Sequence, residues 1–218
     1  MSHKTRSLRD LKRNKPTRSP YNRVLIVTEG KKTEPYYFEA MKDDLKLNTA
    51  NIEIDGDSAP SPRSIVAYAK KRYKDDLLEN GKQDCFDRVY CVFDKDEHST
   101  FTEAIDSIKT ASLKGVYFAI TSIPCFEFWL LLHFTSSTKP YFRSGNRSPA
   151  QNAEHDLKVH LPDYQKGDKT TYHKLKPRID TALLHAKRVN AAAKTSNFDN
   201  PSTSIPELIE YLHNLKKR

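Results

Sequence analysis

Two short apolar runs, at residues 24–27 and 89–93, constrain the fold of this chain more than any other feature of its sequence. Uninterrupted runs of this length, rich in β-branched and aromatic residues, are typical of strands covered on both faces, as in a parallel sheet between two layers of helices. Acidic residues follow each run closely: Glu29 follows the first, and Asp94 and Asp96 follow the second. We therefore expect two buried strands that both end in carboxylates.

The segments around these runs alternate between strand and helix signals. Helical patterns extend over residues 35–45, from 61 to a stop at Asn80-Gly81, and over 102–112. They are separated by four predicted strands, at residues 23–28, 51–55, 88–93 and 116–121. A β-α-β alternation of this kind predicts an α/β fold with a compact sheet.

The chain beyond residue 121 has a different pattern. Residues 122–134 predict a turn followed by a buried helix, and the polar stretch 135–171 predicts a loop around one helix at 149–160. Further helices are expected at 175–194 and 205–217, with a break at 200–203. The predicted organisation is a disordered basic arm at 1–22, an α/β core at 23–134, and a mostly helical C-terminal elaboration at 135–218 packed on the core.

The N-terminal segment carries most of the positive charge of the chain. Eight Lys or Arg residues and one Asp lie within residues 1–23, and the whole chain has a net charge of +9. Such an arm is expected to be disordered when free and attracted to polyphosphates such as RNA or DNA. A solubilising tail has the same composition, so the arm alone does not identify a nucleic-acid-binding protein.

The cysteine pattern and the hydropathy favour a cytoplasmic protein. Cys85, Cys91 and Cys125 are odd in number and form no CxxC spacing, so the sequence indicates neither a disulfide framework nor a zinc site. No apolar stretch approaches the roughly 18 residues that span a bilayer. The basic N-terminus also lacks the apolar segment of a secretory signal. We therefore expect no membrane partner.

The acidic residues at the ends of the two strands predict a metal site. In parallel sheets, ligands bind at the edge formed by the carboxyl ends of the strands, and carboxylates that converge there are costly to bury without a cation. Asp94 and Asp96 would lie on the same side of an extended segment, because strand side chains repeat every second residue. Glu29, Asp94 and Asp96 are therefore expected to bind Mg²⁺ or Mn²⁺. A polar turn at Asp94 and Asp96, and a helix-capping carboxylate at Glu29, are the structural alternatives.

Four longer strings extend this pattern: VLIVTEGKKTEPYYF at 24–38, VFDKD at 92–96, SIPCFEFWLLLHF at 122–134 and NPST at 200–203. Together they resemble the RloB-like family of the Toprim superfamily. The resemblance implies a Rossmann-like Toprim parallel sheet whose edge carries magnesium-dependent phosphodiester chemistry. It further implies cleavage of nucleic acid, with tRNA or other RNA as candidate substrates, in antiphage or abortive-infection defence beside a partner ATPase of the ABC or overcoming-lysogenisation-defect (OLD) type. One departure is that Ile123 and Cys125 stand in the turn where the family usually shows Asn-Pro-Ser.

The site residues then have the following expected roles. Glu29 is a metal ligand or the base that activates water. Glu34 and Glu127 are further catalytic candidates, for which a helix-start charge and a structural salt bridge are the respective alternatives. Gly30 would let backbone or phosphate approach closely. We expect Lys31, Lys32 and Lys95 to contact the substrate, and His98, His133 and Trp129 to be structural.

Three classes of function remain open at this point. The first is a metal-dependent nuclease, and the second is a non-catalytic nucleic-acid-binding or nucleotide-binding sensor subunit of a defence complex. A nucleotidyl or phosphoryl transferase is the third. The chain has no primase-type zinc segment and no recognisable topoisomerase tyrosine domain, which favours the nuclease, but relatives in the wider superfamily differ in their reactions. The sequence does not distinguish a DNA substrate from an RNA substrate.

Overall fold

A five-stranded sheet organises the chain. The structure, a computed structural model, describes residues 22–47, 51–57, 61–111 and 113–216. The strand order is β2-β1-β3-β4-β5, in which the first four strands are parallel and β5 is antiparallel to β4. The strands are β1 (Val24–Thr28), β2 (Ile52–Asp55), β3 (Arg88–Asp94), β4 (Tyr117–Ile123) and β5 (Ser202–Thr203). The predicted Rossmann-like α/β fold is confirmed.

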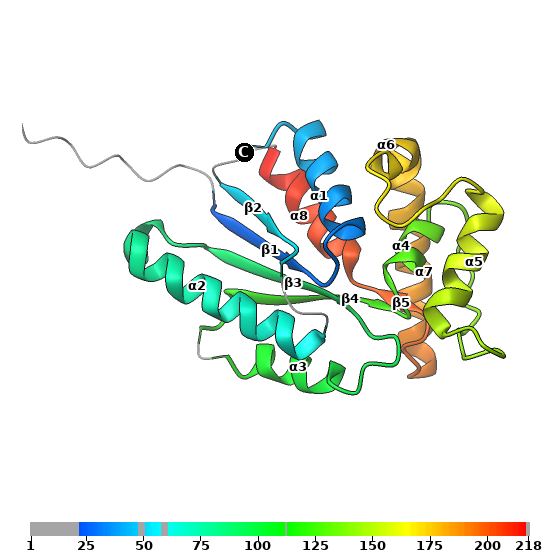
Figure 1. Cartoon of the computed structure of the whole chain (residues 1–218). Coiled ribbons are helices and arrows are strands. Elements are labelled where there is room, and N and C mark those ends of the chain that lie inside the picture. The colour runs from blue at the N-terminus through cyan, green and yellow to red at the C-terminus, as the bar shows by residue number, and fades with distance from the viewer. Residues whose placement is uncertain (1–21, 48–50, 58–60, 112, 217–218) are drawn as a thin grey trace, which may run out of the picture.

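Helices cover both faces of the sheet, and the alternation of side chains along β1 explains why. Leu25 and Val27 pack in one hydrophobic cluster with residues of α2 and α3, whereas Val24 and Ile26 pack in a second cluster with residues of α1 and α8. The two pairs of helices accordingly lie on opposite sides of the strands (Figure 1). These helices are α1 (Thr33–Asp44), α2 (Pro62–Asp84), α3 (Phe101–Lys109) and α8 (Ile205–Lys216). Strands buried on both faces need no polar side, which is why their sequences are continuously apolar.

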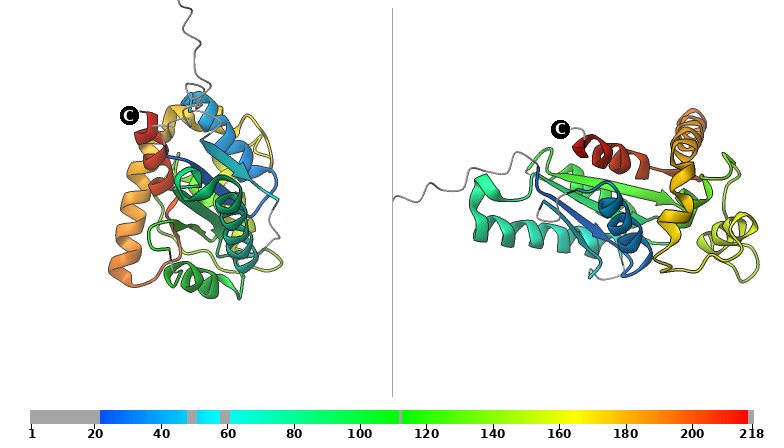
Figure 2. Two further views of the ribbon diagram at one scale, coloured as in Figure 1. Left: turned by 90° about the vertical axis from the view of Figure 1, so that its left-hand side faces the viewer. Right: turned by 90° about the horizontal axis from the view of Figure 1, so that it is seen from above.

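The remaining helices gather beyond the carboxyl ends of the strands (Figures 1 and 2). They are α4 (Phe126–Leu131), α5 (Pro149–His160), α6 (Thr171–Leu175), a 3₁₀ turn (Lys176–Arg178) and α7 (Ile179–Ser196). The start of α5 is fixed by a capping box, in which Ser148 and Gln151 satisfy each other's backbone N–H groups. The prediction of one helix at 149–160 within a polar loop region is confirmed.

Three differences from the sequence-based prediction concern β4, α2 and β5. β4 continues to Ile123, and the stop predicted at Asn80-Gly81 is a kink at Gly81 inside α2. The NPST string, predicted to be only a break, contains β5, and the Ser204 N–H donates to the Thr121 carbonyl at 2.8 Å. A two-residue strand is too short for its periodicity to be visible in a sequence. The region after residue 134 thus supplies the fifth strand of the sheet.

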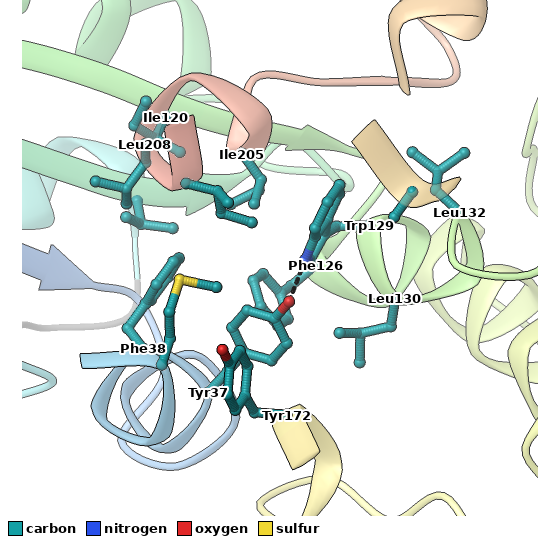
Figure 3. Close-up of a cluster of buried hydrophobic side chains, with 14 of the residues drawn as sticks. Tyr37, Phe38, Ile120, Phe126, Trp129, Leu130, Leu132, Tyr172, Ile205 and Leu208 are labelled. Carbon is teal, nitrogen blue, oxygen red and sulfur yellow. Dashed lines mark hydrogen bonds between the residues drawn. The ribbon is translucent and has the colours of Figure 1, made fainter. Parts of the chain in front are cut away.

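An aromatic cluster joins α1 to α4. The indole Nε1–H of Trp129, which is fully buried, donates to the Tyr37 hydroxyl at 3.1 Å (Figure 3). The Tyr37 ring also makes edge-on contacts with Phe126 and Tyr172 at 5.4 Å between ring centroids. The prediction that Trp129 is a core residue is confirmed. Glu34 lies one turn before Tyr37 on α1, and Glu127 lies two residues before Trp129 on α4, so this cluster fixes the helices that carry both carboxylates.

His133 follows α4 in the same core and provides a test of acid stability. Its Nδ1 lies 3.1 Å from the Leu130 carbonyl, and burial lowers its pKa to about 4, with Arg178 and His185 acting in the same direction. As the pH falls below 6.5, His133 takes up a proton in the unfolded chain, whereas in the folded protein it stays neutral until about pH 4. The free energy of unfolding is therefore unaffected by this residue above pH 6.5 and decreases as the pH falls towards 4. We expect this residue to account for about 3 kcal/mol of the loss at pH 4.

The measurement is urea denaturation of the wild type and a His133→Asn variant between pH 7.5 and 4. The asparagine amide can still donate to the Leu130 carbonyl, but it does not titrate in this range. The cavity that the variant leaves lowers its stability by the same amount at every pH, so the readout is the change with pH. An identical pH dependence in the two proteins would contradict the assignment.

Candidate active site

Glu29 and Asp94 meet at the carboxyl edge of the sheet. The strands β1 and β3 are adjacent, with Thr28 opposite Val92, so the residues that follow each strand lie side by side. The Asp94 N–H donates to Glu29 Oε2 at 3.1 Å, and the Glu29 N–H donates to the Val92 carbonyl at 3.1 Å. The structure therefore brings these two predicted site residues together.

Glu34 reaches the same place from the first turn of α1, and Gly30 makes room for it. The Glu34 side chain is buried, and a Cβ atom at position 30 would lie 2.5 Å from Glu34 Oε2. Any other residue at position 30 would displace the carboxylate. The close approach expected of Gly30 thus involves a protein carboxylate in this structure.

Asp94 lies among three other carboxylates. It keeps some exposure to solvent, yet the protein around its carboxylate raises its pKa well above the usual value, first by burial and then through the charges of Glu34, Glu127 and Glu29. The pKa of Glu34 is raised to about 7, again by burial first and then by Glu127 and Glu29. Like charges placed together disfavour ionisation in this way. We call Glu29, Glu34, Asp94 and Glu127 the acidic cluster.

Glu127 is held by two residues that the sequence did not single out. It lies in the first turn of α4 with only 3% of its side chain exposed. The Tyr164 hydroxyl donates to Glu127 Oε1 at 3.0 Å, and Lys166 Nζ lies 3.0 Å from the same oxygen. Burial alone would lower the pKa of Lys166, but the Glu127 carboxylate raises it. The Gly167 N–H donates to the Thr33 hydroxyl, so residues 164–167 lie across the starts of both α1 and α4.

Nothing in the sequence could have indicated Lys166. It is a single lysine in the polar stretch 135–171, and its partner Glu127 lies 39 residues earlier. Its role depends on the path of the chain from α5 back towards α1, which only the folded structure reveals. The salt bridge proposed as the structural alternative for Glu127 is present, within the same cluster as Asp94.

A Lys166→Met variant is expected to destabilise the protein by about 1–3 kcal/mol, the cost of leaving a buried group without its partner. The loss falls below that of a fully buried pair because 55% of the Lys166 side chain is exposed. Adding Glu127→Gln should recover most of the loss, since the amide carries no charge. Urea denaturation of both single variants and the double variant measures this coupling. Additive losses would show that the pair is not coupled.

Asp96 is not arranged as the sequence predicted. The strand ends at Asp94, and Asp96 has a φ of 27°, so the expectation of an extended segment with both side chains on one side is wrong. The chain turns because the N–H groups of Lys95 and Asp96 donate to the Ser122 and Pro124 carbonyls. Asp96 Oδ1 accepts from the Ala150 N–H at 3.3 Å, near the start of α5. Burial raises the pKa of Asp96.

The three predicted substrate lysines and His98 differ in what they contact. Lys31 is exposed and lies 3.5 Å from Asp57, while the Lys32 side chain lies beside Gly167. Lys95 Nζ is 2.6 Å from Asp199 Oδ2, so it faces another part of the protein. His98 Nε2 lies 3.0 Å from Glu29 Oε1. His98, expected to be structural, therefore contacts a predicted catalytic carboxylate.

The acidic cluster has the type of ligand that a hard divalent cation prefers, but its side chains are not arranged around a common point. All four groups are carboxylates, the ligands that Mg²⁺ and Mn²⁺ prefer. The pKa of Asp94 is raised first by burial and then by neighbouring negative charge, and a cation would offset both effects. Within residues 22–47, 51–57, 61–111 and 113–216, however, no three His, Cys, Asp or Glu side chains are arranged to hold a metal ion. Binding would therefore require carboxylate side chains to turn towards a common point.

A mostly parallel sheet with carboxylates at its carboxyl edge defines a Rossmann-like α/β protein with an acidic site. A family model for RloB-like proteins matches residues 24–212, which include every strand and the whole acidic cluster. The chain belongs to the RloB-like protein family.

Other comparisons add little. The chain is 27% identical over 103 residues to Cytoplasmic polyadenylation element-binding protein 3 of Caenorhabditis briggsae, a match that covers 47% of this chain and 14% of that protein. The chain thus spans a small part of the length of this relative. No solved structure matches the chain significantly. Among the described residues, no helix is both long enough and apolar enough to cross a membrane.

Proposed function

We propose that this protein is a metal-dependent nuclease of the Toprim type that cleaves nucleic acid, with tRNA or other RNA as the first candidate substrate. The observation that carries the proposal is the gathering of Glu29, Glu34 and Glu127 around Asp94 at the carboxyl edge of the sheet. Membership of the RloB-like family supports it. Antiphage or abortive-infection defence, with a partner ATPase of the ABC or OLD type, is part of this proposal.

Asp94 and Glu29 are the proposed principal ligands of Mg²⁺ or Mn²⁺, and Asp96 would complete the set from the neighbouring turn. A bound cation of this kind would neutralise charge on the scissile phosphate and activate water. Glu29 also contacts His98, so this pair can accept a proton and pass it towards solvent. Glu34 and Glu127 place further negative charge beside Asp94 and favour cation binding there.

Substrate contacts are proposed for the loop after β1. Lys31 and Lys32 extend from the same loop as Glu29, and Lys31 is largely exposed, so both can approach a phosphate backbone. Lys95 is held by Asp199 and would have to leave that ion pair to contact substrate. We assign the activity to the cytoplasm, where thiols stay reduced, because Cys85, Cys91 and Cys125 are all free and buried.

A second candidate function is a sensor subunit that binds nucleic acid or nucleotide without turnover. The observation that favours it is the ion pair between Lys166 and Glu127, in which a protein cation already neutralises part of the acidic cluster. In this case the carboxylates would position a ligand rather than a catalytic metal.

The deciding experiment is incubation of the purified chain with total tRNA, single-stranded DNA and double-stranded DNA. Each is tested with Mg²⁺, with Mn²⁺ and with EDTA, and with the Asp94→Asn variant as control. Metal-dependent cleavage by the wild type alone supports the nuclease and identifies its substrate. Tight binding that survives Asp94→Asn, with no cleavage in either metal, supports the sensor subunit instead.

A further inference from the structure

Two exposed phenylalanine rings form a pair outside the hydrophobic core. The Phe142 side chain is 59% exposed and Phe198 is 46% exposed, yet their ring centroids lie 6.3 Å apart at an interplanar angle of 34°. They come from segments more than 50 residues apart, the loop before α5 and the C-terminal end of α7. Single exposed apolar side chains are common, whereas exposed apolar side chains that lie together can mark an interaction site, so this pair is a candidate for one.

The backbones of both phenylalanines are anchored. Asn200, from the NPST string, accepts from the Tyr141 N–H at 3.1 Å and donates to the Tyr141 carbonyl at 2.6 Å, which joins the two segments. The Asn152 amide donates to the Phe142 carbonyl at 2.9 Å, and the Phe198 N–H donates to the Ala193 carbonyl at the end of α7. The backbone is thus fixed at both positions, whereas the two rings stay largely exposed.

The same pair is tied to the loop that follows Asp94. Lys95 Nζ binds Asp199, the residue after Phe198, at 2.6 Å. Glu97 binds Arg143, the residue after Phe142, with Arg143 Nε donating to Glu97 Oε1 at 3.1 Å. Two ion pairs therefore connect the loop that follows Asp94 to the two aromatic segments.

The Phe198 side of the pair borders a cavity that also contains a lysine. Phe198 lines a cavity of about 580 Å³, whose lining also includes Asn190, Lys194, Asp199 and Thr203. Lys194 and Lys139, three residues before Phe142, take part in no ion pair within the described part of the chain. Aromatic faces beside uncompensated lysines are the combination by which proteins bind single-stranded nucleic acid, since bases stack on the rings and lysines attract the phosphates.

We propose that Phe142 and Phe198 form a stacking platform for an unpaired base of a nucleic-acid strand whose backbone extends to the acidic cluster. The proposal rests on the function proposed above and makes it narrower: the substrate presents at least one unstacked base beside the scissile phosphate. The platform reads the flat face of a base and not its hydrogen-bonding edge, so it gives no strong sequence preference.

The test is fluorescence anisotropy in EDTA with two probes, a short single-stranded oligoribonucleotide and an abasic oligoribonucleotide of equal length and charge. The wild type should bind the base-containing probe about tenfold more tightly than the abasic probe. The Phe142→Ala/Phe198→Ala variant should bind the two probes equally. Replacement of both residues by Trp should keep the preference, and replacement by Leu should lose it, because leucine is apolar but has no π face.

A Leu78→Ala variant is the matched control, since Leu78 is 74% exposed on the part of α2 that runs back towards the amino end of β3. It should keep the full preference of the wild type. Equal binding of both probes by the wild type, or an unchanged preference in the double alanine variant, would overturn the platform and leave the pair as a surface for another protein. Because EDTA prevents cleavage, this result is separate from the nuclease assay: either proposal can fail alone.

Discussion

An Asp94→Asn variant is expected to lose metal-dependent cleavage and, in a chelator, to unfold at a higher temperature than the wild type. Changes in residues that only support a metal ligand typically reduce affinity or activity about 10–100-fold. Loss of a ligand itself should therefore reduce cleavage by more than about 100-fold. The amide keeps the shape of the side chain, so packing around it should be preserved.

The gain in stability follows from the direction of the pKa shift. Burial and the neighbouring charges of Glu34, Glu127 and Glu29 raise the pKa of Asp94, so the folded protein disfavours its charged form. The cost of that charge begins to grow as the pH rises above the ordinary pKa of an Asp, and it reaches its full value once the pH exceeds the raised folded pKa. Asparagine removes it, and the difference in Tm should be larger at pH 8 than at pH 5.

In Mg²⁺ the wild type should unfold at a higher temperature than the Asp94→Asn variant, which is the reverse of the order expected in a chelator. A cation present at about a hundred times its Kd stabilises the folded state by about 2.7 kcal/mol, and this gain should be confined to the wild type. Thermal unfolding in EDTA and in Mg²⁺ measures both effects, and Asp106→Asn on the exposed face of α3 is the control. If Asp94→Asn gained as much from Mg²⁺ as the wild type, Asp94 would not be a metal ligand.

Truncation of Trp129 to alanine is expected to reduce the free energy of unfolding by about 3–5 kcal/mol. Domains of this kind are stable by only about 5–15 kcal/mol, so this single change would remove a large share of the total. The reason is that Trp129 is fully buried and is hydrogen-bonded to Tyr37 across the contact between α4 and α1. The variant should also lose activity, since these helices carry Glu127 and Glu34.

A Tyr37→Phe variant separates the hydrogen bond from the packing. It keeps the ring but leaves the indole N–H without its acceptor, at a cost of about 1–3 kcal/mol. Circular dichroism in urea is the suitable probe for Trp129→Ala, because Trp129 is the single tryptophan of the chain and its fluorescence is lost with it. A loss below about 1 kcal/mol in Trp129→Ala would mean that the core can close around the cavity.

The parts of the site that could be predicted are those that follow directly from strands. Glu29 and Asp94 each come at the end of an apolar run, and adjacent parallel strands place such residues together whatever the rest of the chain does. The aromatic core around Trp129 was predictable for a similar reason, since residues 126–134 are too apolar to be exposed. Short-range patterns were sufficient in both cases.

The parts that could not be predicted depend on long-range contacts and on turns. The predicted orientation of Asp96 was wrong because an extended backbone was assumed through Lys95 and Asp96, whereas the chain turns after Asp94 and the turn redirects the side chain. The partners of Glu127 lie 37 and 39 residues after it in a region without periodicity. The carboxylates could therefore be identified from the sequence, whereas Lys166 and Tyr164, which hold Glu127, could not.

The order in which these segments occur along the chain has a consequence for biosynthesis. Proteins are made from the N-terminus onwards, and domains generally begin to fold as they emerge. Glu29, Glu34 and Asp94 leave the ribosome first, Glu127 follows, and its partners Tyr164 and Lys166 come later still.

β5 and α8 come last, from residue 202 onwards. A growing chain therefore carries an unpaired Glu127 until Tyr164 and Lys166 have emerged, and an incomplete sheet until β5 has emerged. For a nuclease of the proposed kind, this order delays assembly of the acidic cluster until these later segments have emerged from the ribosome, which is itself made largely of RNA.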